Sequence, residues 1–138
     1  APLAQFMQTH QLADVGTIKG LSQDMLADMQ QYDAFVSASY SEGFGLAYLE
    51  AMSLGLPIAT YANRYGAQTL VRDGENGYLA AFEPQTTAEA QNITHLAAAM
   101  RRIFDNYDAL SRGASRRSSA FLNADIARQW GRLVEALT

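Results

Sequence analysis

Two glutamates flank a glycine-rich turn near the middle of the chain. Glu42 precedes a Gly-Phe-Gly turn at residues 43–45, and Glu50 is the only charged residue between positions 43 and 63. A carboxylate within an apolar segment costs free energy unless it binds a partner. We therefore expect the two acids to bind a ligand.

The turn and the helix predicted after it are suited to holding a phosphate or diphosphate. Glycines at 43 and 45 allow close approach to the backbone, and free N–H groups at the start of a helix from Leu46 bind anions without a basic side chain. Glu50, about one and a half turns into that helix, can accept hydrogen bonds from ribose hydroxyls, and Glu42 from a second polyol. This order of sugar, diphosphate and ribose suits a nucleotide-sugar. The alternative is that Glu50 only occupies an exposed helix face.

The elements that must position these residues are alternating strands and helices. Apolar patterns predict strands at 14–18, 34–38, 57–61 and 78–82. They predict helices at 2–12, 23–31 and 46–54, a helical turn at 68–71, and helices from 87, at 107–122 and at 124–137. This alternation indicates an α/β fold, a Rossmann-like parallel sheet with C-terminal helices. Ligands bind beyond the carboxyl ends of such strands, where Glu42 and Leu46 fall.

Local patterns also predict caps and buried faces. Ser22 is expected to cap the helix at 23–31. The uncharged segment 34–38 is typical of the buried middle of a parallel sheet. The helix residues expected to be buried are Met25, Leu26, Met29, Leu96, Met100, Ile103, Phe104, Ile126, Trp130, Leu133 and Leu137.

The composition indicates one domain and excludes several kinds of site. The chain has 138 residues and no cysteine, so it offers no disulfide, thiolate metal site or cysteine nucleophile. Its two histidines, at 10 and 95, lie far apart without a metal-ligand pattern, so no metal site is expected. We expect one domain over 1–138, with an α/β portion at 1–86 and a helical tail at 87–138.

Charge and hydropathy narrow the expected partners. Residues 1–100 carry three Arg or Lys and ten Asp or Glu, whereas residues 101–138 carry seven Arg and four acids. The basic tail lacks interleaved aromatics, which argues against nucleic-acid binding. It forms either a solvated helix face or a face for an anionic acceptor or lipid headgroups, which allows peripheral membrane association. The apolar run at 43–63 contains Glu50, Pro57 and three glycines, so we do not expect a membrane span, nor a signal peptide before it.

Two segments carry a resemblance to a known family. Residues 41–58, Ser-Glu-Gly-Phe-Gly-Leu-Ala-Tyr-Leu-Glu-Ala-Met-Ser-Leu-Gly-Leu-Pro-Ile, resemble the Glu-x7-Glu signature of retaining glycosyltransferases with the two-domain GT-B fold. Residues 64–79 are similar to the branch that contains poly(glycerol-phosphate) glucosyltransferases and the glycosyltransferases of the accessory secretion pathway. That branch usually has Asn where this chain has Ala67.

The resemblance implies a role for each residue of the turn. Glu42 would be the catalytic-site residue that contacts the donor sugar, and Glu50 would hold the ribose hydroxyls. The backbone of the turn would line the sugar and diphosphate pocket, and the next N–H would bind the diphosphate. The residues with these backbone roles are Gly43, Phe44, Gly45 and Leu46.

The family resemblance further implies uridine diphosphate sugars as donors, no metal or other cofactor, and a cytoplasmic location. It also implies an Arg and a Lys that neutralise the leaving diphosphate. Lys19 is the only lysine and lacks the expected context, so we expect this pair outside the chain. The chain would then be a fragment of the C-terminal nucleotide-sugar-binding domain, inactive without the N-terminal GT-B domain.

The implied activity is transfer of a hexosyl residue, of glucose or N-acetylglucosamine type, to a carbohydrate, teichoic-acid-like polymer or protein acceptor. One alternative is a non-catalytic GT-B-like adapter subunit that pairs with an active glycosyltransferase, although an adapter has no need of both glutamates. A nucleotide-sugar epimerase or phosphorylase of the same fold would be expected to show additional His or Lys residues.

Overall fold

The computed structural model describes residues 2–84 and 88–137, and its strands form one parallel sheet. The strands are β1 (Phe35–Ser37), β2 (Ile58–Tyr61) and β3 (Gly77–Ala80), in the order β1-β2-β3. Phe35 pairs with Ile58, which pairs in turn with Gly77. The predicted α/β fold with a parallel sheet and C-terminal helices is confirmed.

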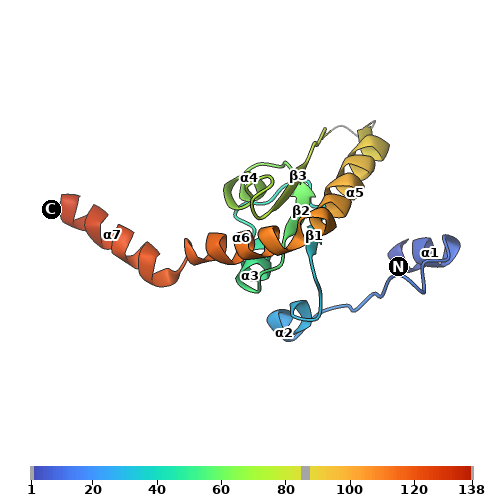
Figure 1. Ribbon diagram of the computed structural model, residues 1–138, viewed down its shortest axis with the longest axis horizontal. Helices are drawn as coiled ribbons and strands as arrows, with labels where there is room; N and C mark the ends of the chain where they lie inside the picture. Colours follow the sequence, from blue (N-terminus) through green and yellow to red (C-terminus); the bar gives the residue numbers. More distant parts are fainter. Residues whose placement is uncertain (1, 85–87, 138) are drawn as a thin grey trace.

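Helices cover both faces of this sheet (Figure 1). Successive β2 side chains point to opposite faces, so Ile58 joins one buried cluster and Ala59 the other. The Ile58 cluster also contains residues of α3 (Leu46–Ser53) and α4 (Gly66–Leu70), with α6 (Tyr107–Ser119) packed on α3. The Ala59 cluster lies beneath α5 (Glu89–Asp105). The sheet is therefore the middle of three layers.

The strand predicted at 34–38 is confirmed as β1, but its expected place in the sheet was wrong, and the strand predicted at 14–18 is not formed. Segment 34–38 was expected in the middle of the sheet, but β1 lies at the edge of the described sheet, which leaves Val36 39% exposed. Segment 14–18 forms turns and irregular backbone rather than a strand. Its Val15 and Ile18 side chains are exposed, and no described strand lies beside it to pair its backbone groups.

The N-terminal helices are short. Helix α1 spans Pro2–Thr9 and α2 spans Met25–Met29. Asp24, not the predicted Ser22, caps α2, because its side chain accepts the N–H of Ala27 at 3.0 Å. Of the three side chains predicted to be buried in α2, only Met29 is buried, whereas Met25 and Leu26 remain exposed.

The set of buried residues predicted for α5 is partly wrong. Leu96 and Ile103 are buried, whereas Met100 and Phe104 are exposed. Ala99 is buried between the two correct positions, so the line of contact with the sheet is narrower than the apolar pattern indicated. The predicted start of this helix at Thr87 lies outside the described residues.

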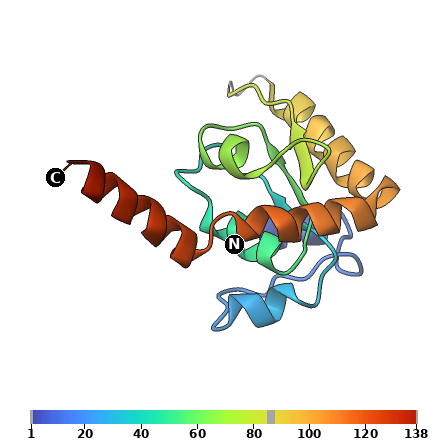
Figure 2. The same cartoon turned by 60° about the vertical axis from the view of Figure 1, so that its left-hand side comes forward.

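Helix α7 (Asn123–Leu137) extends away from the three layers in both views (Figures 1 and 2). Its apolar face was predicted to be buried, and this prediction was wrong. No described element packs on that face, so all four of its apolar side chains are exposed, Trp130 to 62%. They are Ile126, Trp130, Leu133 and Leu137.

Candidate functional site

The Gly-Phe-Gly turn leads from the carboxyl end of β1 into α3. Gly45 is the N-cap of α3 with φ of 87°, a left-handed conformation in which an added Cβ would lie 2.7 Å from the Tyr48 ring. The N–H groups of residues 43–47 donate to no acceptor in the described part of the chain. Successive N–H groups without a partner at a helix start, where the helix dipole is positive, suit a phosphate or diphosphate.

Glu42 is half-buried and is fixed through its backbone. Its carbonyl accepts the N–H groups of Tyr65, at 2.9 Å, and Gly66, at 3.1 Å. An added Cβ on Gly66 would overlap the Phe44 carbonyl, so only glycine permits this close approach. The start of α4 therefore holds the turn in place. Sequence reasoning missed Gly66, and its position after a strand end was the only available signal.

Glu50 is exposed on α3 and borders a cavity of about 260 Å³. The cavity is lined by Leu26, Leu49, Glu50, Ser53, Ser118, Phe121 and Leu122. The Glu50 carboxylate has no hydrogen-bond or ion-pair partner among residues 2–84 and 88–137, and the Ser53 hydroxyl donates to the Glu50 backbone carbonyl at 2.6 Å. The exposed helix face expected as the alternative is thus present, and the same face is open to hydroxyl groups of a ligand.

Phe121 connects the two glutamate regions. It lines the cavity beside Glu50 and makes an edge contact with Phe44, with ring centroids 5.9 Å apart. Phe44 remains 42% exposed, so its ring is available on one side. The structure therefore places the turn and Glu50 on one continuous surface, with an aromatic pair between them. Phe121 was not singled out from the sequence.

Tyr48 anchors α3 to the ends of two strands. Its hydroxyl donates to Ser37 Oγ at 3.1 Å and lies 3.1 Å from Thr60 Oγ1. Tyr48 and Thr60 are fully buried, so these hydroxyls satisfy one another without water. This network fixes where the N-terminus of α3 lies relative to the sheet.

Lys19, the only lysine of the chain, forms its contacts beside α2. Lys19 donates to Asp28 at 3.3 Å, and hydrogen bonds to Tyr32 and then Asp28 raise its pKa. The same contact, after a hydrogen bond from Ser22, lowers the pKa of Asp28. Lys19 therefore lies in a surface ion pair with Asp28.

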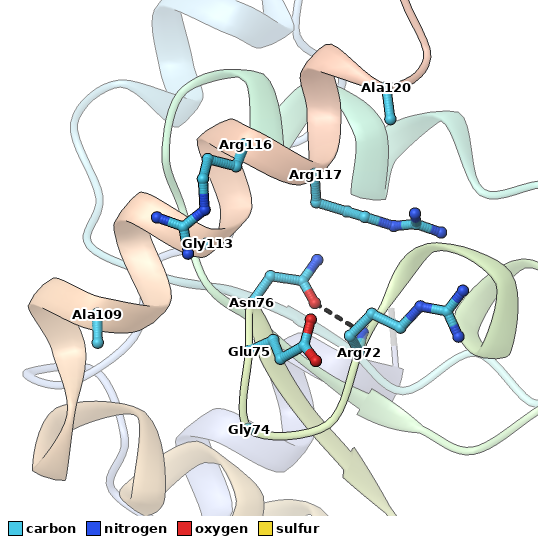
Figure 3. A pocket seen from close by; sticks show the side chains of 9 residues that line it. All are labelled: Arg72, Gly74, Glu75, Asn76, Ala109, Gly113, Arg116, Arg117 and Ala120. Carbon is cyan, nitrogen blue, oxygen red and sulfur yellow. Dashed lines mark hydrogen bonds between the residues drawn. The ribbon is translucent and has the colours of Figure 1, made fainter.

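A larger cavity, of about 450 Å³, lies at the opposite edge of the sheet (Figure 3). The turn at 72–76 precedes β3, so this cavity is at the amino ends of the strands, whereas Glu42 follows the carboxyl end of β1. It is lined by Arg72, Gly74, Glu75, Asn76, Ala109, Gly113, Arg116, Arg117 and Ala120. Arg117 donates to the carbonyls of Thr69 and Leu70, so it completes the end of α4. Burial, followed by the charge of Arg72, lowers the pKa of Arg117.

Neither a metal centre nor a membrane span is present in the described residues. No group of three His, Asp or Glu side chains there is arranged to hold a metal ion. No helix between residues 2 and 137, outside the gap at 85–87, is long and apolar enough to cross a bilayer.

A parallel sheet with a glycine turn and unpaired N–H groups at its carboxyl edge has the layout of a phosphate-binding α/β domain. Residues 2–114 match the family described as glycosyl transferases group 1, and the chain belongs to that family.

Relatives and a solved structure agree with this assignment. The chain is 30% identical over 134 residues to the UDP-N-acetylglucosamine–peptide N-acetylglucosaminyltransferase GtfA subunit of Streptococcus pneumoniae serotype 4, covering 96% of this chain and 26% of the relative. It is 44% identical over 62 residues to the poly(glycerol-phosphate) alpha-glucosyltransferase of Bacillus subtilis, covering 45% of this chain and 9% of the relative. The crystal structure of the pneumococcal O-GlcNAc transferase GtfA with UDP and GlcNAc superimposes with a TM-score of 0.87 at 31% identity, covering 98% of this chain and 27% of that one. The chain thus spans about a quarter of the length of its pneumococcal relative.

Proposed function

We propose that this chain is the donor-binding part of a retaining glycosyltransferase that transfers glucose or N-acetylglucosamine from a UDP-sugar to a protein or polymer acceptor. The observation that carries the proposal is the run of free N–H groups at residues 43–47, which lies between two carboxylates. Membership of the family of group 1 glycosyl transferases supports it. So do the names of two relatives, a UDP-N-acetylglucosamine–peptide N-acetylglucosaminyltransferase subunit and a poly(glycerol-phosphate) alpha-glucosyltransferase.

Each residue of the turn has a proposed role. Glu42 accepts hydrogen bonds from the donor sugar, and Glu50 from the ribose hydroxyls. The backbone of Gly43, Phe44 and Gly45 lines the sugar and diphosphate pocket, and the N–H of Leu46 binds the diphosphate. This preorganised backbone stabilises the charge that develops on the departing diphosphate, which requires neither a protein nucleophile nor a metal.

The proposal includes two parts outside the chain. The Arg and Lys that neutralise the diphosphate, and the N-terminal domain that would bind the acceptor, belong to a longer protein of cytoplasmic location. The pneumococcal relative is named a subunit, which also keeps the second candidate open, a non-catalytic adapter that pairs with an active glycosyltransferase. An adapter of this kind would not bind UDP at Glu50.

Calorimetric titration of the full-length protein with UDP tests the proposal. Because a hydrogen bond to a charged group contributes about 1.5–3 kcal/mol, Glu50→Gln should raise the Kd for UDP by about ten- to a hundredfold. Glu75→Gln is the matched control, since Glu75 lines the cavity at the other edge of the sheet. Glu42→Gln should retain UDP affinity and lose hexosyl transfer.

The alternatives give different results. Absence of UDP binding, or an affinity unchanged by Glu50→Gln, would reject the donor site and favour the adapter. Proton NMR of the transfer product reports the anomeric configuration, and an inverted product would reject retention while leaving the donor site in place.

A further inference from the structure

Three aromatic rings gather where the three strands end. Tyr40 follows β1, Tyr61 is the last residue of β2, and Phe82 follows β3. The ring centroids of Tyr40 and Tyr61 are 6.0 Å apart, those of Tyr40 and Phe82 5.1 Å, and those of Tyr61 and Phe82 5.0 Å. Tyr61 is 2% exposed, whereas Tyr40 is 55% exposed. The Tyr40 ring therefore rests on an aromatic base and presents much of its surface to solvent.

The position of Tyr40 is fixed relative to Glu42. The Asn63 amide donates to the Ser39 carbonyl at 2.6 Å, immediately before Tyr40. The N–H groups of Tyr65 and Gly66 hold the Glu42 carbonyl two residues after Tyr40. Both ends of this short segment are thus tied to residues 63–66, which fixes the backbone from which the Tyr40 ring projects.

A second observation at this edge concerns Asn63. Asn63 is 3% exposed, and its Oδ1 atom has no hydrogen-bond donor in the described structure. Buried acceptors in folded proteins are usually satisfied by a protein donor or by ordered water. The edge thus combines an exposed aromatic ring, a carboxylate and an unsatisfied amide oxygen.

These groups suit a pyranose ring. A hexose has an apolar face of C–H groups that packs on an aromatic ring, and hydroxyls at its rim that bind carboxylates and amides. A tyrosine has few rotatable bonds, so it gives contact area at low entropic cost. We propose that Tyr40 is the stacking surface for a pyranose ring beside Glu42. The inference rests on the proposed function, and the ring can come from the donor sugar or from a sugar on the acceptor.

Binding of free N-acetylglucosamine to the full-length protein saturated with UDP tests this inference. The variants are Tyr40→Ala and Tyr40→Phe, and Tyr32→Ala is the control, because Tyr32 is a similarly exposed tyrosine, at 50%, on the α2 side. Tyr40→Ala should raise the Kd for the sugar by about two- to tenfold, as expected for one aromatic contact. Tyr40→Phe and Tyr32→Ala should leave it unchanged, and UDP affinity should be the same in every variant.

The source of the ring follows from repeating the titration with a non-hydrolysable phosphonate analogue of UDP-N-acetylglucosamine in place of UDP. If the analogue abolishes sugar binding, Tyr40 stacks on the donor sugar. If binding persists and still depends on Tyr40, the ring stacks on an acceptor sugar.

Two results overturn the inference while leaving the proposed function intact, provided that wild type binds UDP in a Glu50-dependent manner. The first is the absence of an effect on sugar binding, either because Tyr40→Ala leaves the Kd for the sugar unchanged or because wild type does not bind the sugar. The other is an equal loss in Tyr40→Phe, which would assign the effect to the hydroxyl rather than to stacking. Failure of wild type to bind UDP rejects both proposals.

Discussion

The side-chain amide of Asn63 donates to the backbone carbonyl of Ser39 across 2.6 Å and so joins the loops that follow β2 and β1. Asn63 is buried, and its Oδ1 atom has no donor in the described structure. Only the amide nitrogen of Asn63 is thus hydrogen-bonded, and this bond holds the start of the segment that carries Tyr40 and Glu42. Asn63 therefore positions the candidate site without belonging to the Gly-Phe-Gly turn.

Removing this amide should destabilise the protein. In Asn63→Ala the Ser39 carbonyl loses its donor, and an unsatisfied buried acceptor costs about 1–3 kcal/mol. We expect a loss of this size in the free energy of unfolding measured by urea denaturation, and a weaker affinity for UDP-sugars. Asn63→Asp is the matched variant, because a carboxylate cannot donate to Ser39, whereas a protonated carboxyl can. The loss in the free energy of unfolding caused by Asn63→Asp should therefore shrink as the pH falls. A loss that does not depend on pH would argue against the contact with Ser39.

The Tyr48 hydroxyl offers a second test. Tyr48→Phe removes the group that bonds Ser37 and Thr60, and leaves the buried Thr60 hydroxyl without this partner. The expected loss in the free energy of unfolding is about 1–3 kcal/mol. Since the hydroxyl also fixes the start of α3, UDP affinity should fall as well. Thr94→Ala is the control, because the exposed Thr94 hydroxyl bonds only the Ala90 carbonyl within α5, and an equal loss in both variants would contradict the anchoring role.

Gly66 should tolerate no side chain. The Cβ of Gly66→Ala would overlap the Phe44 carbonyl and lie 3.2 Å from Glu42 Cβ, so the turn must shift. We expect a loss of about 1–3 kcal/mol in the free energy of unfolding, and loss of UDP binding by calorimetry. Gly131→Ala is the control, because nothing lies within 4 Å of its added Cβ in α7. It should stabilise the protein by up to about 1 kcal/mol. Unchanged UDP binding in Gly66→Ala would show that the turn does not depend on this approach.

Local signals predicted most of the fold. Glycine and proline positions bounded α3 and β2 to within one residue of the observed Leu46–Ser53 and Ile58–Tyr61. Alternation of strands and helices gave the parallel sheet. These features depend on periodicity and turn chemistry within a few residues, which a sequence displays directly.

Contacts between distant segments could not be predicted in this way. Asn63 and Ser39 are 24 residues apart, and the approach of Gly66 to Phe44 depends on where two loops meet. The pattern of α7 indicates an apolar face around Trp130 but not what covers it. Likewise, the apolar composition of β1 did not reveal that it lies at the edge of the described sheet. The roles of Glu42 and Glu50 remain predictions.

Arg117 should be structural and Arg116 dispensable, although both line the cavity at the amino ends of the strands (Figure 3). Arg117 donates to the Thr69 carbonyl at 2.6 Å and lies over the Phe121 ring at 4.9 Å. Arg117→Ala should therefore cost about 1–3 kcal/mol in the free energy of unfolding. Arg116→Ala, an exposed substitution, should change it by less than about 0.5 kcal/mol. Similar losses in the two variants would show that Arg117 does not hold the end of α4.

Tyr61 should make stability fall at high pH. Burial, and then the charges of Tyr40 and Glu89, raise the pKa of its hydroxyl above 10.0. Between pH 10.0 and the raised pKa, the unfolded chain loses this proton and the folded chain keeps it, so unfolding becomes easier as the pH rises. The unfolding temperature of wild type should therefore decline more steeply above this pH than that of Tyr61→Phe. Tyr65→Phe, at an exposed tyrosine, should follow wild type, and parallel curves for wild type and Tyr61→Phe would show that the Tyr61 hydroxyl ionises equally in both states.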